Sequence, residues 1–147
     1  MAWIGLAEVE HALAKVAADA TKASKLIVRD SVVLVERAAK KNFEGHHKRG
    51  YPHVGGDKPN VVTGALRRSI HADPIRAYGT YEYGTSIGPR TVYARRVELG
   101  FDGGAGRGQQ ATRAFPYFRP AVESTREAMH EIAARHWREI VLKGRRG

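Results

Sequence analysis

The sequence predicts an α+β fold made of a long N-terminal helix, a small antiparallel β-sheet and a C-terminal helix. Apolar residues recur at alternating steps of three and four from Leu6 to Ile27, which is the spacing of a helix with one buried stripe. Residues 69–88 carry aromatic and β-branched side chains punctuated by glycines, as short strands joined by turns do. A second helical spacing covers residues 122–140. Because 147 residues suffice for one modest core, we expect a single domain over 1–147.

The N-terminal helix is the clearest of these elements. Its apolar stripe consists of Leu6, Val9, Leu13, Val16, Ala20, Ala23 and Ile27. Asp30 interrupts the stripe and Leu34 resumes it, so we expect the helix to reach about Phe43, a length of about 60 Å at 1.5 Å per residue. The β-branched residues from Val28 to Val35 leave a kink or a strand open there. Because such a helix exceeds what one small domain covers, we expect its first turns to pack against another chain.

The middle of the chain alternates loops with short elements. Residues 45–60 are dense in Gly, Pro, His and Lys without periodicity, so they are predicted to form an exposed loop. Thr63 is expected to cap a short helical turn from Gly64 to Arg68, and two or three antiparallel strands are expected after it. Residues 91–100 fit neither the helical nor the strand period, so both structures remain open for them.

A stiff and bulky segment leads into the C-terminal helix. It follows a glycine-rich stretch, 101–112, that is predicted to be a second exposed loop. Pro120 suits the first turn of the helix, because its φ is fixed near the helical value and it has no N–H to leave unpaired. The aromatic side chains of the segment are Phe115, Tyr117 and Phe118. Two interpretations are open: all three belong to the core, or the outer ones face a neighbouring subunit. The helix is expected to end at Gly144.

Composition narrows the classes of partner and of chemistry. Lys and Arg number 25 against 15 Asp and Glu, a formal charge of +10, which favours nucleic acid or an acidic protein surface as partner. The absence of cysteine excludes disulfides, thiolate metal sites and cysteine nucleophiles, and suits assembly in a reducing cytoplasm. The longest apolar run, Val32 to Val35, is far too short for a membrane span, so we expect no membrane partner.

The residues that most often carry catalysis or metal binding do not form a site in this sequence. His130 and His136 are six residues apart, about 240° around a helix, so they cannot face one metal; we expect a solvated His130 and a partly packed His136. His46, His47 and His53 near Asp57 are a weak metal candidate without a second cluster.

Other catalytic and cofactor patterns fail as well. The glycines near 103–108 match neither the dinucleotide nor the P-loop spacing. Ser69 and His71 are close in sequence, but no third group orients them. We therefore expect no enzyme activity, no cofactor and no metal.

Basic residues form several pairs that are candidates for contact with a polyanion. These are Arg67, Arg68, Arg95, Arg96, Arg145 and Arg146. Tyrosines lie between the pairs, as in proteins that combine phosphate contacts with base stacking. No base-reading motif accompanies them, so we expect any DNA contact to be weak and independent of sequence.

Three short motifs, in this order, carry a resemblance to a known family. They are TGALRRSI (63–70), VYARRVELG (92–100) and RAFPYFRPAVES (113–124). Together they resemble the gene-product-ten-like family of minor tail, or head-to-tail joining, proteins of long-tailed bacteriophages. The resemblance implies a non-enzymatic α+β subunit of the phage neck or the head-proximal tail end, a tail-completion protein that works as a homo-oligomeric ring and docks other neck and tail proteins.

This resemblance sets the expected function and its alternatives. We expect a ring, with six as the expected number of subunits, that joins the head to the tail of the virion after assembly in the host cytoplasm. The candidate subunit interface comprises Leu6, Val9, Leu13, Val16, Phe115, Tyr117, Phe118 and Arg119. The alternatives are a tail-terminator ring that caps the tail tube, a basic nucleic-acid-binding protein and, third, an uncharacterised hydrolase.

Overall fold

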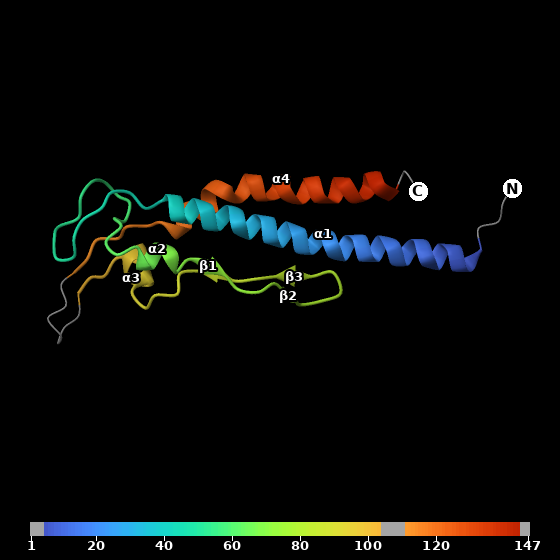
Figure 1. Ribbon diagram of the computed structural model, residues 1–147, viewed down its shortest axis with the longest axis horizontal. Helices are drawn as coiled ribbons and strands as arrows, with labels where there is room; N and C mark the ends of the chain where they lie inside the picture. Colours follow the sequence, from blue (N-terminus) through green and yellow to red (C-terminus); the bar gives the residue numbers. More distant parts are fainter. Residues whose placement is uncertain (1–4, 104–110, 145–147) are drawn as a thin grey trace. The chain divides into compact units, whose positions relative to one another are not determined.

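The computed structural model describes residues 5–103 and 111–144. The helices are α1 (Leu6–Lys41), α2 (Ala65–Arg68), α3 (Ala94–Leu99) and α4 (Phe118–Gly144). The strands are β1 (His71–Ala72), β2 (Arg76–Ala77), β3 (Tyr83–Gly84) and β4 (Ile87–Gly88), as Figure 1 shows. The predicted α+β fold, with a long N-terminal helix, short antiparallel strands and a C-terminal helix, is confirmed.

The chain divides into two compact units. The first comprises Met1–Ser31, Pro74–Thr85 and Glu127–Gly147, and the second comprises Val32–Asp73 and Ser86–Arg126. Helices α1 and α4 each contribute to both units. A single cooperative domain over 1–147 stays a prediction, because compact units within one chain need not unfold separately.

Helix α1 is continuous through its β-branched stretch, so the alternative of a strand between Val28 and Val35 is wrong. Its 36 residues correspond to about 54 Å at 1.5 Å per residue. Lys40 and Lys41 lie in its last turn, where cations interact favourably with the helix dipole. The helix ends two residues before the predicted Phe43. At that end the side-chain amide of Asn42 donates a hydrogen bond of 2.8 Å to the carbonyl oxygen of Tyr117.

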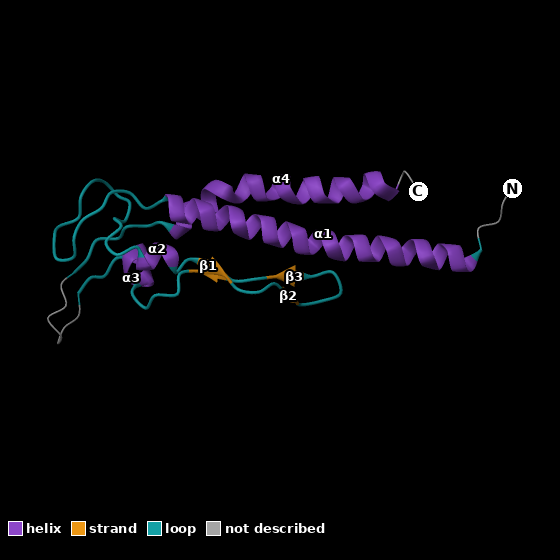
Figure 2. Ribbon diagram, in the orientation of Figure 1, coloured by secondary structure: helices purple, strands orange, loops and turns teal. Residues whose placement is uncertain are grey.

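The first unit contains a β-hairpin and parts of the two long helices. In the hairpin Arg76 pairs with Gly84 and Ala77 with Tyr83 in antiparallel register, and the strands appear as short arrows in Figure 2. The ammonium group of Lys25 on α1 lies 5.0 Å from the centre of the Tyr83 ring, a cation–π contact.

The second unit holds most of the core. Its buried cluster consists of Ala39, Leu66, Ile70, Ala94, Tyr117 and Ala121. The ring of Phe43 packs on that of Tyr117 with centroids 4.9 Å apart. A second antiparallel pair joins His71 to Gly88 and Ala72 to Ile87. The core therefore combines the end of α1 with residues from all three motifs, TGALRRSI, VYARRVELG and RAFPYFRPAVES.

Glycines at positive φ shape both short helices. Gly64 (φ 73°) precedes α2, where the Thr63 hydroxyl accepts a hydrogen bond of 3.3 Å from the Ala65 N–H. The open question over 91–100 resolves to helix α3, which Gly100 (φ 75°) ends. A Cβ at Gly100 would lie 2.9 Å from backbone atoms of both Thr112 and Ala114. Only glycine allows this close approach of two backbone segments.

The described residues of the two predicted loops, 45–60 and 101–112, form no helix and no extended strand. Within 45–60, the Asn60 side chain donates to the carbonyl oxygens of Glu44 and Val54 and accepts from the Val54 N–H. These hydrogen bonds join the end of the loop to its start and to its middle. In the second loop Phe101 and Thr112 pair antiparallel, and residues 104–110 lie outside the described part. None of the helices in the described ranges combines the length and the apolar character that a membrane span requires.

Candidate functional site

The first turns of α1 present an uncovered apolar stripe, which we call the α1 stripe. It consists of Leu6, Val9, Leu13 and Val16, with exposed fractions of 75, 42, 64 and 54%. The 3-4 spacing predicted a buried face here, and the described residues of this chain do not bury it. Within the same unit, Ala23 of α1 is buried to 4% exposure, so the same face of the helix is covered further along.

The reason for this contrast is where α4 ends. A shallow cavity is lined by Asp19, Lys22, Ala23, Leu26, His136, Glu139, Ile140 and Lys143. The last turn of α4 therefore lies beside Asp19 and Lys22, and the turns of α1 before Asp19 continue past it, as Figure 1 shows within this unit. The α1 stripe occupies this overhang.

The aromatic segment before α4 separates into inner and outer side chains. Tyr117 is fully buried in its own core, which corrects the expectation that it faces a neighbouring subunit. Phe115 and Phe118 are half-buried, and Arg119 is exposed. Phe118 lines a groove of about 330 Å³ together with Val92, Arg95 and Leu99. Phe115 lines other cavities, so the two phenylalanines do not share one surface.

Glu98 fixes the start of α4 and was not singled out from the sequence. One carboxylate oxygen accepts hydrogen bonds from the N–H groups of Tyr117 and Phe118 at 2.8 and 2.9 Å, and the other accepts from Arg119 at 2.9 Å. These are donors that a helix start leaves unpaired, and the negative charge suits the positive end of the helix dipole. Two of the three motifs, VYARRVELG and RAFPYFRPAVES, thus meet in one capping interaction.

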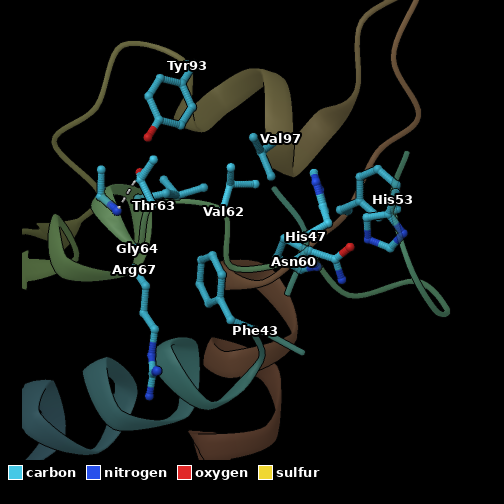
Figure 3. Close-up of a pocket in the computed structure, with 14 residues that line it drawn as sticks. Phe43, His47, His53, Asn60, Val62, Thr63, Gly64, Arg67, Tyr93 and Val97 are labelled. Carbon is cyan, nitrogen blue, oxygen red and sulfur yellow. Dashed lines mark hydrogen bonds between the residues drawn. The ribbon is translucent and has the colours of Figure 1, made fainter. Parts of the chain in front are cut away.

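An apolar cavity of about 330 Å³ opens in the second unit. Figure 3 shows Val97 of α3 and Tyr93, the residue before that helix, on one side, Phe43 on the opposite side, and His47 and His53 together at one end. The His53 ring stacks on Phe115 with centroids 4.1 Å apart and donates from Nε2 to the Lys58 carbonyl at 2.9 Å. Sequence patterns did not indicate this cavity, because its lining comes from four separated segments.

The described candidates for polyanion contact lie at three places in the second unit. Arg67 and Arg68 are exposed and line a groove of about 410 Å³ with Lys40 and His46. Arg95 is exposed in the groove beside Phe118. Arg96 is half-buried, with its guanidinium 4.5 Å from the centre of the Phe101 ring and Nε donating to the Thr112 hydroxyl at 3.0 Å. Arg145 and Arg146 lie outside the described residues.

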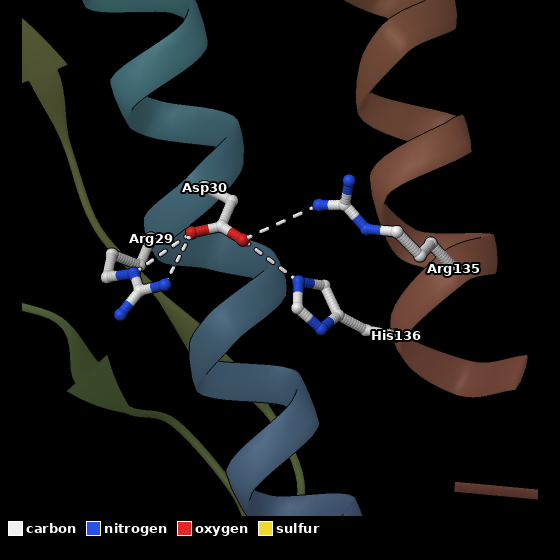
Figure 4. A network of polar contacts seen from close by, with 4 residues as sticks. All are labelled: Arg29, Asp30, Arg135 and His136. Carbon is white, nitrogen blue, oxygen red and sulfur yellow. Dashed lines mark hydrogen bonds and ion pairs between the residues drawn. The ribbon is translucent and has the colours of Figure 1, made fainter. Parts of the chain in front are cut away.

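A polar network crosses between α1 and α4 in the first unit (Figure 4). One oxygen of Asp30 accepts from His136 Nε2 at 2.9 Å, with Arg135 3.8 Å away. The other accepts two hydrogen bonds from Arg29, at 2.8 and 2.9 Å. The His136 hydrogen bond is the main reason that the pKa of Asp30 is lowered, and Arg29 adds to it against the opposing effect of burial. A carboxylate can therefore occupy this position in the apolar spacing of α1, because His136 of α4 donates a hydrogen bond to it.

The described histidines form no metal centre. His136 is partly packed and His130 is exposed, as predicted. The rings of His47 and His53 lie 6.4 Å apart, while Asp57 forms an ion pair with Arg113. Within 5–103 and 111–144, no group of three or more His, Cys, Asp or Glu side chains is placed to hold a metal ion.

Comparisons of this chain with protein-family models, with curated proteins and with solved structures find no match.

Proposed function

We propose that this chain is a non-enzymatic structural protein of the head-to-tail interface of a long-tailed bacteriophage. In this proposal it is a neck or tail-completion subunit that assembles into a ring, with six subunits expected, and joins the head to the tail of the virion. The observation that carries the proposal is the α1 stripe, four apolar side chains on one helix face that are 42–75% exposed. Contiguous apolar surface of this kind is typical of protein–protein contact sites.

The convergence of the three motifs adds support. The resemblance to the phage family rests on motifs separated in sequence, and each contributes a buried side chain to one core: Leu66, Ala94 and Ala121. Glu98 then links the second motif to the third. A shared packing role gives a physical reason for these motifs to occur together in one chain.

The first prediction is that Leu13→Asp abolishes self-association while leaving the subunit folded. Leu13 is 64% exposed, so the new carboxylate stays in water in the free subunit but would be desolvated in an assembled interface. Sedimentation velocity measures the assembly state, and circular dichroism measures the helix and strand content. We expect an unchanged spectrum, a thermal midpoint within a few degrees of wild type, and loss of the oligomer.

Val33→Asp is the matched control. Val33 is also an exposed apolar residue of α1, at 40%, but it lies off the 3-4 spacing of the stripe, so this variant should assemble normally. A Leu13→Asp protein that assembles as wild type, in solution and in particles, would contradict the proposed contact. Catalytic turnover by the purified chain, lost on replacing one polar side chain such as His71, would contradict the non-enzymatic role.

A further inference from the structure

A second apolar face, on α4, has a position and charge that fit the α1 stripe. Ala134, Trp137 and Val141 are all exposed, Trp137 at 43% and Val141 at 59%. Their spacing of three and four residues places them on one side of the helix. This side is about 120° around the helix from His136 and Ile140, which line the cavity shared with α1. We call Ala134, Trp137 and Val141 the α4 face.

The two surfaces carry opposite charge. Residues 6–16 of α1, which span the stripe, include Glu8 and Glu10 against Lys15, which leaves one net negative charge. Residues 134–141 of α4, which span the face, include Arg135 and Arg138 against Glu139, which leaves one net positive charge. Charge complementarity of this kind orients an association and disfavours the like-charged pairing of one α1 stripe with another.

The side chains available also suit an interface. Tryptophan is enriched among the residues that dominate binding energy, and it is most effective when a partner excludes water from it. In the α1 stripe, Leu and Val side chains offer a surface for the Trp137 ring, and within the chain Ala23, which continues the spacing of the stripe, already lies beside α4. The stripe of one copy therefore continues a type of packing that the fold already uses.

We infer that the α1 stripe of one subunit docks on the α4 face of a second copy of this chain, in a head-to-tail contact; this inference rests on the proposed ring assembly. Because the two surfaces differ, a docked pair still offers one free stripe, on one subunit, and one free face, on the other. Contacts of this type repeat until the rotation closes a ring, whereas a stripe-to-stripe contact would stop at a dimer.

Disulfide trapping tests the contact directly, because the chain contains no cysteine. Leu13→Cys and Val141→Cys proteins are each prepared alone and then mixed under oxidising conditions. We expect a disulfide-linked dimer of one chain of each kind in the mixture, and a ladder of higher species from the double variant Leu13→Cys/Val141→Cys. Cross-linking only between two Leu13→Cys chains, or none at all, would overturn the inference.

A charge exchange gives a second measurement. Glu10→Lys and Arg138→Glu should each weaken self-association about fivefold, and the two together should restore most of the loss, as paired exposed charges do. Additive weakening would contradict the pairing of these two surfaces. Sedimentation of the wild-type chain and of the cysteine variants separates the docking contact from the ring assembly on which it rests. An oligomer that forms without the Leu13–Val141 cross-link rejects only the docking contact. A chain that stays monomeric at all concentrations rejects the ring as well.

Discussion

Glu98 is the residue on which the second unit depends most for its local geometry. Its carboxylate accepts three backbone hydrogen bonds at the start of α4, and Gly100, two residues later, allows its backbone to approach Thr112 and Ala114. A carboxylate that satisfies several free N–H groups at a helix start combines capping with a favourable dipole interaction. The position of the aromatic segment is thus fixed by two residues of one short motif.

We predict that Glu98→Ala lowers the free energy of unfolding by about 2 kcal/mol, since it leaves three helix N–H groups without their charged acceptor. Urea denaturation followed by circular dichroism measures this change. Glu123→Ala is the control, because Glu123 is exposed and its ion pair with Arg119 along the helix is long, at 4.0 Å. A contact of this kind is worth a few tenths of a kcal/mol. Equal effects of the two substitutions would show that the cap contributes nothing of its own.

Tyr117 shows the limit of sequence inference at a single residue. Three aromatics in the four positions 115–118 indicated that bulky side chains are needed there, yet they did not indicate which one is innermost. Its hydroxyl has no hydrogen-bond partner among the described residues. Burial, with Glu98 and Tyr93 nearby, raises the pKa of Tyr117 far above its usual range. The direction of each ring depends on where Glu98 and Asn42 hold the backbone, which is tertiary information absent from local sequence.

Among the elements, α1 and α4 of the first unit are joined by a partly buried polar contact as well as by apolar packing. Asp30 lies in the apolar spacing of α1 and accepts a hydrogen bond from His136 of α4. Because the folded state lowers the pKa of Asp30 below its ordinary value of 3.8, this carboxylate stabilises the fold above that value. The contribution is lost as the pH falls through the folded pKa.

We therefore predict that Asp30→Asn lowers the free energy of unfolding by about 1 kcal/mol at pH 6, since a charged acceptor is replaced by a neutral one. The difference between wild type and variant should shrink as the pH falls from 5 to 3. Thermal or urea unfolding over this range measures it. Asp19→Asn serves as the control on the same helix. A difference that is constant with pH would mean that the ionised carboxylate of Asp30 has no stabilising role.

The elements differ in how far the sequence predicts them, for physical reasons. The long helices follow from apolar periodicity, which is a local property of many residues. Helix α3 was undetermined, because six residues give too few repeats. Its end at Gly100 depends on a close approach to the backbone of Thr112 and Ala114, which is a contact with a distant segment. The strands are only two residues long and form two pairs, so their register comes from pairing partners rather than from alternation along one strand.

For the whole molecule, the net charge of +10 is a statement about partners rather than about fold. The groove lined by Arg67 and Arg68 supplies two exposed cations without a helix or strand arranged to read base edges, and Lys40 in the same groove is partly buried and paired with Glu36. Phosphate contacts of this kind position a protein on DNA but carry no sequence information. Such contacts would give the proposed neck subunit a secondary interaction with packaged DNA.

We predict weak duplex DNA binding that falls steeply between low and physiological salt and does not distinguish sequences. Replacing Arg67 and Arg68 with Ala should reduce the slope of log affinity against log salt by about 2, since each lost phosphate contact removes about 0.9. Replacing Arg76 and Arg126, which are exposed outside this groove, removes the same charge and should change the slope less. Tight, sequence-selective binding at physiological salt would instead favour the nucleic-acid-binding alternative over the neck protein.

The overhang that bears the α1 stripe has a thermodynamic consequence for any partner. Residues 6–16 form about three helical turns that gain no packing energy from α4, and isolated helices of this length are marginal in water. Their amide hydrogens should therefore exchange with solvent faster than those around Ala23. A partner that covers the stripe must also hold these turns in the helical state, and the loss of conformational entropy opposes its binding. A contact made through the stripe should consequently be weaker than its buried area suggests, and in the proposed ring a subunit held by one such contact should dissociate more readily than one held on both sides.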